Sequence, residues 1–155
     1  MAEEEQQFEE RTTDIFNIYT NEETVEDERF GQITIMRAMK PENIAYEQIF
    51  KVERIIHGAG ELALCEQQVI TRLSLENENI IEMMDYCYSL VDAEEEKYHF
   101  TGFYEYPNQD LQREILYRSR TFKNFTDLEI FNIVKDICSG LFYLQINKLL
   151  HGDLR

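Results

Sequence analysis

A long helical pattern near the end of the chain constrains the fold more than any other feature. Thr126-Asp127-Leu128-Glu129 fits a capping box, in which Thr126 accepts from a backbone N–H and Glu129 reaches back to the cap. Phe125 and Ile130 have the spacing of a hydrophobic staple. Apolar residues then recur at three- and four-residue steps, at Ile130, Ile133, Val134, Ile137, Leu141 and Leu144. We expect a long helix whose wide apolar stripe is buried on several sides.

Strand patterns precede this helix. Residues 30–37 place apolar side chains at alternate positions, Ile33 and Ile35, which is the period of a β-strand. Further strand patterns cover residues 44–56, 80–90 and 98–106, with turn-forming or acidic residues between them. Because the first two strand patterns are joined by a short turn, we expect hairpins and an antiparallel sheet.

Two further helices and one weaker element complete the expected order. Leu62, Cys65, Val69 and Leu73 lie on one face of a helix, and residues 110–117 favour a short helix. Around residues 15–19 we expect one short strand or helical turn, and we expect no buried element in the acid-rich residues 21–29. The predicted fold class is therefore α+β: an antiparallel sheet with one helix, followed by helices.

Charge and cysteine content exclude several classes of protein. The chain has 31 acidic and 15 basic residues, a net charge of −16, so its surface would repel nucleic acid and anionic membranes. No apolar run is long enough to span a membrane, and the acidic start is not a signal peptide. Three well-separated cysteines are typical of free thiols in a reducing compartment, the cytoplasm or the nucleus. The acidic start is either a solvated segment or a means of recruiting a basic partner.

The order of these elements, followed by His151-Gly152-Asp153-Leu154-Arg155, resembles the protein kinase catalytic domain. The five closing residues are similar to the His-Arg-Asp-Leu-Lys signature, and Ser139-Gly140-Leu141-Phe142-Tyr143-Leu144 precedes them at the end of the long helix, as in the family. The resemblance implies an acidic segment at residues 1–29, an N-lobe at 30–106, and a hinge with part of the helical C-lobe at 107–155.

The resemblance also implies an ATP site in the N-lobe. Lys51 in Ile49-Phe50-Lys51-Val52 is similar to the strand lysine that pairs with the α- and β-phosphates. Glu66 is our choice for the helix carboxylate that holds this lysine, and Glu61 is the competitor. Without a nucleotide, Lys51 would be an ordinary edge-strand lysine that points to solvent.

Two loops would surround the nucleotide. Gly31 and Ile33 match the third glycine and the valine of the glycine-rich loop, whereas Glu26 and Glu28 stand at its first two glycines. Carboxylates close to a polyanion are repulsive. Backbone groups from Glu105 and Tyr106 to Pro107 would bind adenine at the hinge, with Tyr104 as a bulky gatekeeper that would pack in the sheet in any case.

For catalysis, the resemblance implies Asp153 as the residue that accepts the proton of the substrate hydroxyl, and Arg155 as the γ-phosphate contact. His151 is expected to be structural. Magnesium, held with ATP, would have its ligands beyond Arg155, and no metal ligand is expected within the chain. We therefore expect a fragment of a kinase, inactive by itself, that stops within the catalytic loop.

The implied function is ATP-dependent phosphoryl transfer to the hydroxyl of a protein substrate, of the serine/threonine type. Two alternatives stay open. A pseudokinase-like binding or scaffold module is favoured by Glu26 and Glu28, and an unrelated α+β interaction domain would also fit the predicted elements.

Overall fold

The structure is a computed structural model that describes residues 10–27, 30–107 and 110–151. It divides the chain into two compact units. The first comprises Met1–Leu75 with Glu82–Tyr106, and the second comprises Glu76–Ile81 with Pro107–Arg155. Each unit is described by itself.

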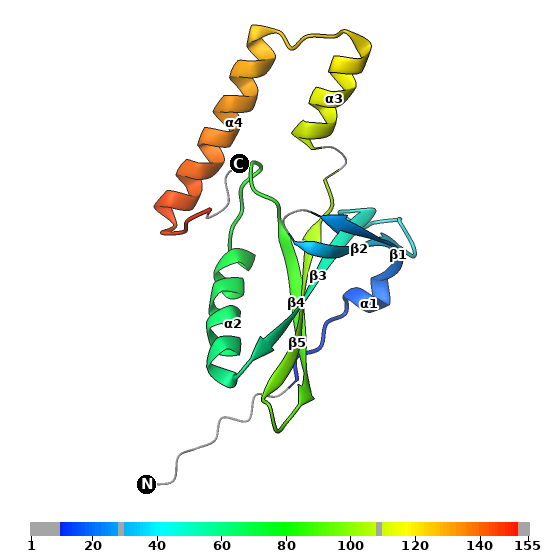
Figure 1. The fold of residues 1–155 in the computed structure, drawn as a ribbon, viewed down its shortest axis with the longest axis vertical. Helices are drawn as coiled ribbons and strands as arrows, with labels where there is room; N and C mark the ends of the chain where they lie inside the picture. Colours follow the sequence, from blue (N-terminus) through cyan, green and yellow to red (C-terminus); the bar gives the residue numbers. More distant parts are fainter. Residues whose placement is uncertain (1–9, 28–29, 108–109, 152–155) are drawn as a thin grey trace. The chain divides into compact units, whose positions relative to one another are not determined.

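The first unit is a five-stranded antiparallel sheet with one long helix along its face (Figure 1). The strand order is β1-β2-β3-β5-β4. Its elements, in chain order, are α1 (Ile15–Ile18), β1 (Tyr19–Asp27), β2 (Gly31–Ala38), β3 (Gln48–His57), α2 (Ala59–Leu73), β4 (Met83–Asp92) and β5 (Lys97–Glu105). The expected α+β class and the antiparallel pairing are confirmed.

The acidic region before residue 30 contributes more to the sheet than the sequence indicated. α1 is followed directly by β1, which pairs with β2 from Tyr19↔Ala38 to Asp27↔Gly31. Most β1 side chains are exposed, as expected for residues 21–29. A strand at the edge of a sheet tolerates such charge, and charged edges also hinder pairing with a second chain.

Two apolar clusters cover opposite faces of the sheet. On one face, α2 packs against β4 and β5 with Leu62, Cys65 and Val69. On the other, Ile15 and Tyr19 pack with strand residues Met36, Ile49 and Phe103. Successive residues of a strand point to opposite faces, so one strand can contribute residues to both clusters.

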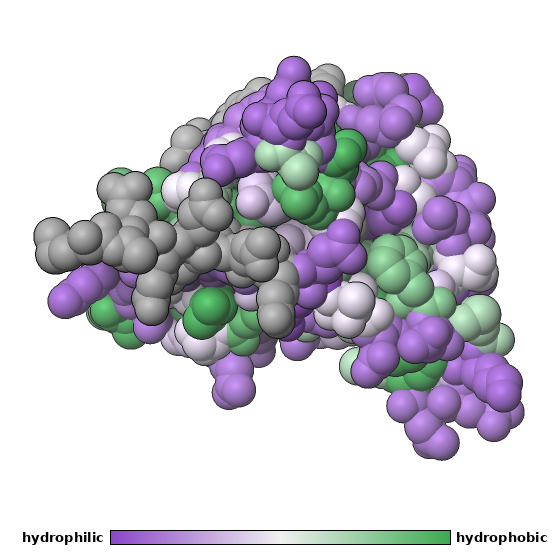
Figure 2. Space-filling view, turned by 90° about the horizontal axis from the view of Figure 1, so that it is seen from below, coloured by the Kyte–Doolittle hydropathy of each residue, from purple (hydrophilic) through white to green (hydrophobic). Residues whose placement is uncertain are grey.

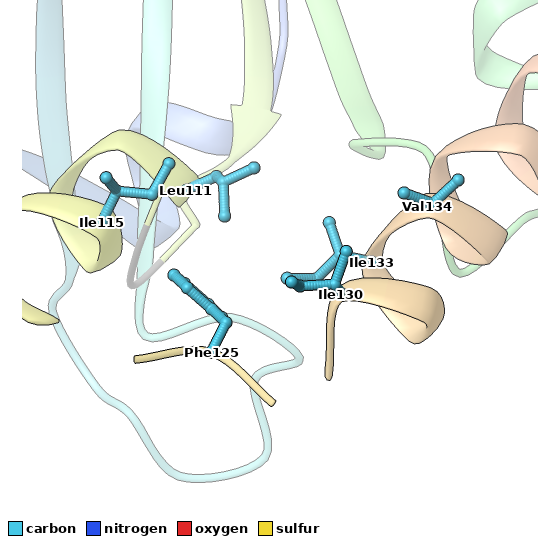
Figure 3. Close-up of a pocket in the computed structure, with 6 residues that line it drawn as sticks. All are labelled: Leu111, Ile115, Phe125, Ile130, Ile133 and Val134. Carbon is cyan, nitrogen blue, oxygen red and sulfur yellow. The ribbon is translucent and has the colours of Figure 1, made fainter. Parts of the chain in front are cut away.

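The second unit contains α3 (Leu111–Thr121) and α4 (Asp127–Ile146). The expected capping box is present: the Glu129 N–H donates to Thr126 Oγ1 over 3.3 Å, and the Thr126 N–H donates to Glu129 Oε2 over 2.8 Å. Arg118 of α3 binds Glu114 and Glu129, with N–O distances of 2.6 and 2.8 Å. A cavity of about 190 Å³ lies between the two helices, and its six lining residues are apolar (Figure 3).

The apolar stripe of α4 is less buried than expected. Of its described residues only Gly140 is buried, while Val134 is 53% exposed and Phe142 is 63% exposed. The expectation that this helix is buried on several sides is therefore wrong for the described structure. The sequence pattern reports which side chains share a face, but burial requires a surface for that face to pack against.

Among the described residues, no helix is long and apolar enough to cross a membrane. Figure 2 shows hydrophilic residues separating smaller hydrophobic groups on the face in view. This is the surface expected of a chain with 30% charged residues.

Candidate functional site

A cavity of about 180 Å³ opens on the α2 face of the sheet, in the first unit. Strand β3 contributes Val52 and Arg54 to its lining, and β5 contributes Phe100, Gly102 and Tyr104. The two strands are paired so that Val52 faces Gly102 and Arg54 faces Phe100. These side chains therefore share one face, because directly opposed residues of an antiparallel pair point to the same side.

Gly102 leaves space on this face that a larger residue would fill. A Cβ at this position would lie 3.1 Å from the Tyr104 ring and 3.2 Å from the Met83 methyl group. The Tyr104 ring is stacked on Phe50, with a centroid distance of 5.2 Å. The aromatic wall of the cavity therefore depends on a glycine two residues before Tyr104, on the same face of β5.

Helix α2 closes the cavity with Gln68, Val69 and Arg72. The Arg72 guanidinium lies 5.4 Å from the centre of the Tyr104 ring, and that of Arg54 lies 5.2 Å from the centre of the Phe100 ring. Arg54 also donates to Cys65 Sγ. Burial raises the pKa of the Cys65 thiol, although Arg54 acts in the opposite direction, so the thiol is neutral at pH 7.

The structure places Lys51 on the opposite face of β3 from this cavity. It is paired with Phe103, which belongs to the cluster around α1, and its Nζ lies 5.9 Å from the centre of the Phe16 ring. The residue is 9% exposed, and its ammonium group binds Glu53 over 2.9 Å. Lys51 is therefore a largely buried lysine with a carboxylate partner on its own strand.

Glu66 has a different partner from the one that the sequence suggested. Its carboxylate accepts a 2.9 Å hydrogen bond from the Tyr86 hydroxyl on β4. Burial and this bond raise the pKa of Tyr86 to about 12. Glu61, the competing choice, accepts from the backbone N–H of His57 over 3.1 Å. The structure thus does not bring Lys51 together with Glu66.

The predicted glycine-rich loop is a hairpin between β1 and β2. Gly31 has a φ of 72°, a left-handed conformation that favours glycine. Ile33 is buried and lies opposite Val52, so it belongs to the cavity's face of the sheet. Glu26 is paired with Gln32, and Glu28 lies outside the described residues.

The predicted hinge begins at Glu105, the last residue of β5, and continues with Tyr106. The Glu105 N–H donates to the Glu82 carbonyl over 3.0 Å, and the Glu105 carboxylate accepts from the Glu82 N–H, also over 3.0 Å. Tyr106 packs its ring against Phe50 at 6.3 Å. The backbone N–H of Glu105 is thus already used by the sheet.

The two residues expected to carry catalysis, Asp153 and Arg155, lie outside the described residues. Within residues 10–27, 30–107 and 110–151, no group of three His, Cys, Asp or Glu side chains is arranged to hold a metal ion. The magnesium site stays a prediction.

Arg54 and Arg72 are cavity residues that the sequence reading missed. Both could have been found from periodicity. Arg54 is two residues from Val52, on the same face of a strand, and Arg72 follows Cys65 and Val69 at helical spacing. The lysine in Ile49-Phe50-Lys51-Val52, on which the resemblance to a kinase rests, points to the other face.

Comparison with known proteins gives two findings on the sequence. No family model matches the chain. Over 116 residues, 75% of the chain, it is 28% identical to a probable cyclin-dependent kinase 8 of Dictyostelium discoideum. The chain resembles a protein kinase. The resemblance expected from the sequence is thereby confirmed. The matched residues amount to 29% of the relative's length.

Proposed function

We propose that this chain is the N-lobe and the beginning of the C-lobe of a protein kinase of the serine/threonine type. Its function would be ATP-dependent phosphoryl transfer to the hydroxyl of a protein substrate, in the cytoplasm or the nucleus. The observation that carries the proposal is the similarity to a probable cyclin-dependent kinase 8 over 75% of a chain whose first unit is an antiparallel sheet packed against α2.

The α2-face cavity is the proposed place for ATP in the first unit. Aromatic rings suit the purine base, and guanidinium groups suit phosphates. Ile33 would cover this face as the valine of the family does, and Gly31 would let the hairpin turn above it. Backbone groups of Glu105 and Tyr106 would form hydrogen bonds with the edge of adenine. The Glu105 N–H would not be one of them, because it donates to the Glu82 carbonyl.

The chemical step is assigned to residues at the end of the sequence. Asp153 would orient the substrate hydroxyl and accept its proton, and Arg155 would contact the γ-phosphate. When bound, magnesium would neutralise charge on the phosphates, and its ligands would follow Arg155 in a longer protein.

A pseudokinase-like binding or scaffold module is the second candidate. Two observations favour it: Glu26 stands where the family has a glycine, and Lys51 lies on the face of β3 away from the cavity, with its ammonium bound to Glu53. A carboxylate close to the phosphates would repel them, and Lys51 would add no positive charge to the cavity.

Two measurements, first of nucleotide binding and then of phosphoryl transfer, distinguish the two candidates. The melting temperature of the chain would be measured with ATP and magnesium, since a ligand at 100 times its Kd stabilises a protein by about 2.7 kcal/mol. A rise in melting temperature supports the nucleotide site, and no rise at millimolar ATP contradicts it. Transfer of labelled γ-phosphate to a protein by the full-length protein, abolished by Asp153→Asn, would support the kinase. Binding without transfer favours the pseudokinase.

A further inference from the structure

Two arginines converge on the α2-face cavity from different elements. Arg54 comes from strand β3 and Arg72 from the last turn of helix α2. We infer that Arg54 and Arg72, rather than Lys51, hold the phosphate groups of a nucleoside polyphosphate at this cavity. This inference rests on the proposed function, because it concerns the same nucleotide site.

Neither arginine has a carboxylate partner within ion-pair distance among the described residues. By contrast, Arg11 binds Asp85, Arg37 binds Glu22, and Arg118 binds Glu129. In a chain with 31 acidic and 15 basic residues, carboxylates are abundant. Two guanidinium groups that line one cavity without a carboxylate are therefore available to an external anion.

The contacts that these two side chains do make leave their charge intact. Each lies over an aromatic ring, Arg54 at 5.2 Å from Phe100 and Arg72 at 5.4 Å from Tyr104. Arg54 also donates to the Cys65 sulfur, whose thiol is neutral because burial raises its pKa. Aromatic faces position a guanidinium but do not neutralise it. A guanidinium fork binds two phosphate oxygens at once, which suits it to this task.

Lys51 is poorly placed for the same role. Val52 and Arg54 are one and three residues from Lys51 on the same strand. Because side chains alternate along a strand, both point to the face opposite to Lys51, and both line the cavity. The Lys51 side chain is 10% exposed, and its ammonium group is bound to Glu53. A phosphate in the α2-face cavity would therefore meet the two arginines and not this lysine.

The expected ligand combines phosphate with a planar ring system. The cavity's aromatic residues, Phe100 and Tyr104, give the base an apolar surface, while the arginines give the phosphates a charged one. Free polyphosphate could bind the arginines but has no base to bind the aromatic residues. Comparison of the affinities for ATP, adenosine and inorganic tripolyphosphate therefore separates a nucleotide ligand from free polyphosphate.

Titration calorimetry on the whole 155-residue chain tests the assignment. Arg54→Met and Arg72→Met should each weaken ATP binding about 10-fold or more, because each removes a charge-assisted contact. The affinity of these variants for adenosine should change less than about two-fold. An unfolded variant would lose its affinity for adenosine as well. Arg37→Met is the matched control, since Arg37 is paired with Glu22 and Glu47 away from the cavity, and it should leave ATP affinity unchanged.

Several outcomes would overturn the inference. If Lys51→Met weakens ATP binding more than either arginine variant, the phosphates lie on the other face of the sheet. If the arginine variants lose affinity for ATP and for adenosine equally, the arginines only support the aromatic wall. Tripolyphosphate that binds as tightly as ATP would overturn the nucleotide as ligand. In each case the unaltered chain still binds a phosphate ligand, whereas no binding of ATP at all would contradict the proposed function itself.

Discussion

The Tyr86 hydroxyl on β4 donates a 2.9 Å hydrogen bond to the Glu66 carboxylate on α2. The bond joins the middle of the helix to the sheet beside the apolar cluster that contains Leu62, Cys65 and Val69. Because the acceptor is charged, the bond is stronger than one between neutral groups. It therefore fixes how α2 lies above the cavity to which the helix contributes Arg72.

Removal of this hydroxyl should loosen the helix. Tyr86→Phe deletes the donor and retains the ring, so we expect the free energy of unfolding to fall by about 1–2 kcal/mol. Denaturation in urea measures the change. Glu66→Gln retains an acceptor and should cost less. Equal stability of Tyr86→Phe and the unaltered chain would mean that the bond contributes nothing in solution.

The core beneath α2 should be sensitive to the loss of volume. Leu62 is 0% exposed, whereas Leu64, two residues further along the same helix, is 63% exposed. Leu62→Ala should lower the free energy of unfolding by about 2–5 kcal/mol, because it leaves a cavity. Leu64→Ala should change it by less than about 0.5 kcal/mol. Similar effects of the two substitutions would contradict the orientation of α2 described above.

The capping box should stabilise the start of α4. Thr126→Ala removes the side-chain acceptor for the Glu129 N–H and should cost about 1 kcal/mol. Ser139→Ala in the body of the same helix is the control, and it should be neutral or slightly stabilising because alanine has the higher helix propensity. Hydrogen exchange of the amides in the first turn reports the local loss. Unchanged exchange there would show that the cap does not form.

The same cap should make α4 sensitive to acid. Hydrogen bonds from Arg118, and then from Thr126, lower the pKa of Glu129 from 4.5 to about 2. A carboxyl with a lowered folded-state pKa stabilises the fold above its unfolded pKa, and this stabilisation is lost as the pH falls. Circular dichroism should therefore show helix loss between about pH 4.5 and 2. Glu129→Gln should flatten that part of the pH profile, and an unchanged profile would exclude Glu129 as its cause.

Gly140 is the buried residue of α4 and lies close to a neighbouring segment. A Cβ there would lie 2.9 Å from the Asn79 carbonyl oxygen, within the second unit. Gly140→Ala should destabilise the protein by about 1 kcal/mol or more, because the contact is with backbone and exceeds the gain in helix propensity. Gly60→Ala, in α2, meets nothing within 4 Å and should stabilise by about 0.5 kcal/mol. Thermal denaturation of both variants checks the difference in sign.

Local patterns were reliable where the cause is local. The helix of Leu62, Cys65 and Val69 and the capping box at Thr126 depend on residues within one or two turns, so spacing was sufficient to predict them. The strand pattern around Ile33 and Ile35 likewise corresponds to β2. The β1 strand was harder to predict, because an edge strand of acidic residues carries no apolar alternation and forms through pairing with β2.

The sequence by itself determined the fold class, the order of the elements from β2 to α4 and the resemblance to a protein kinase. Only the tertiary structure decided which face of β3 meets α2, and therefore that Arg54 lines the cavity while Lys51 lies on the other side. Alternation shows that residues 51 and 54 point in opposite directions, but it does not say which direction is which. That choice depends on where α1 and α2 pack on the sheet. Local sequence patterns do not predict packing between segments that are distant in the chain.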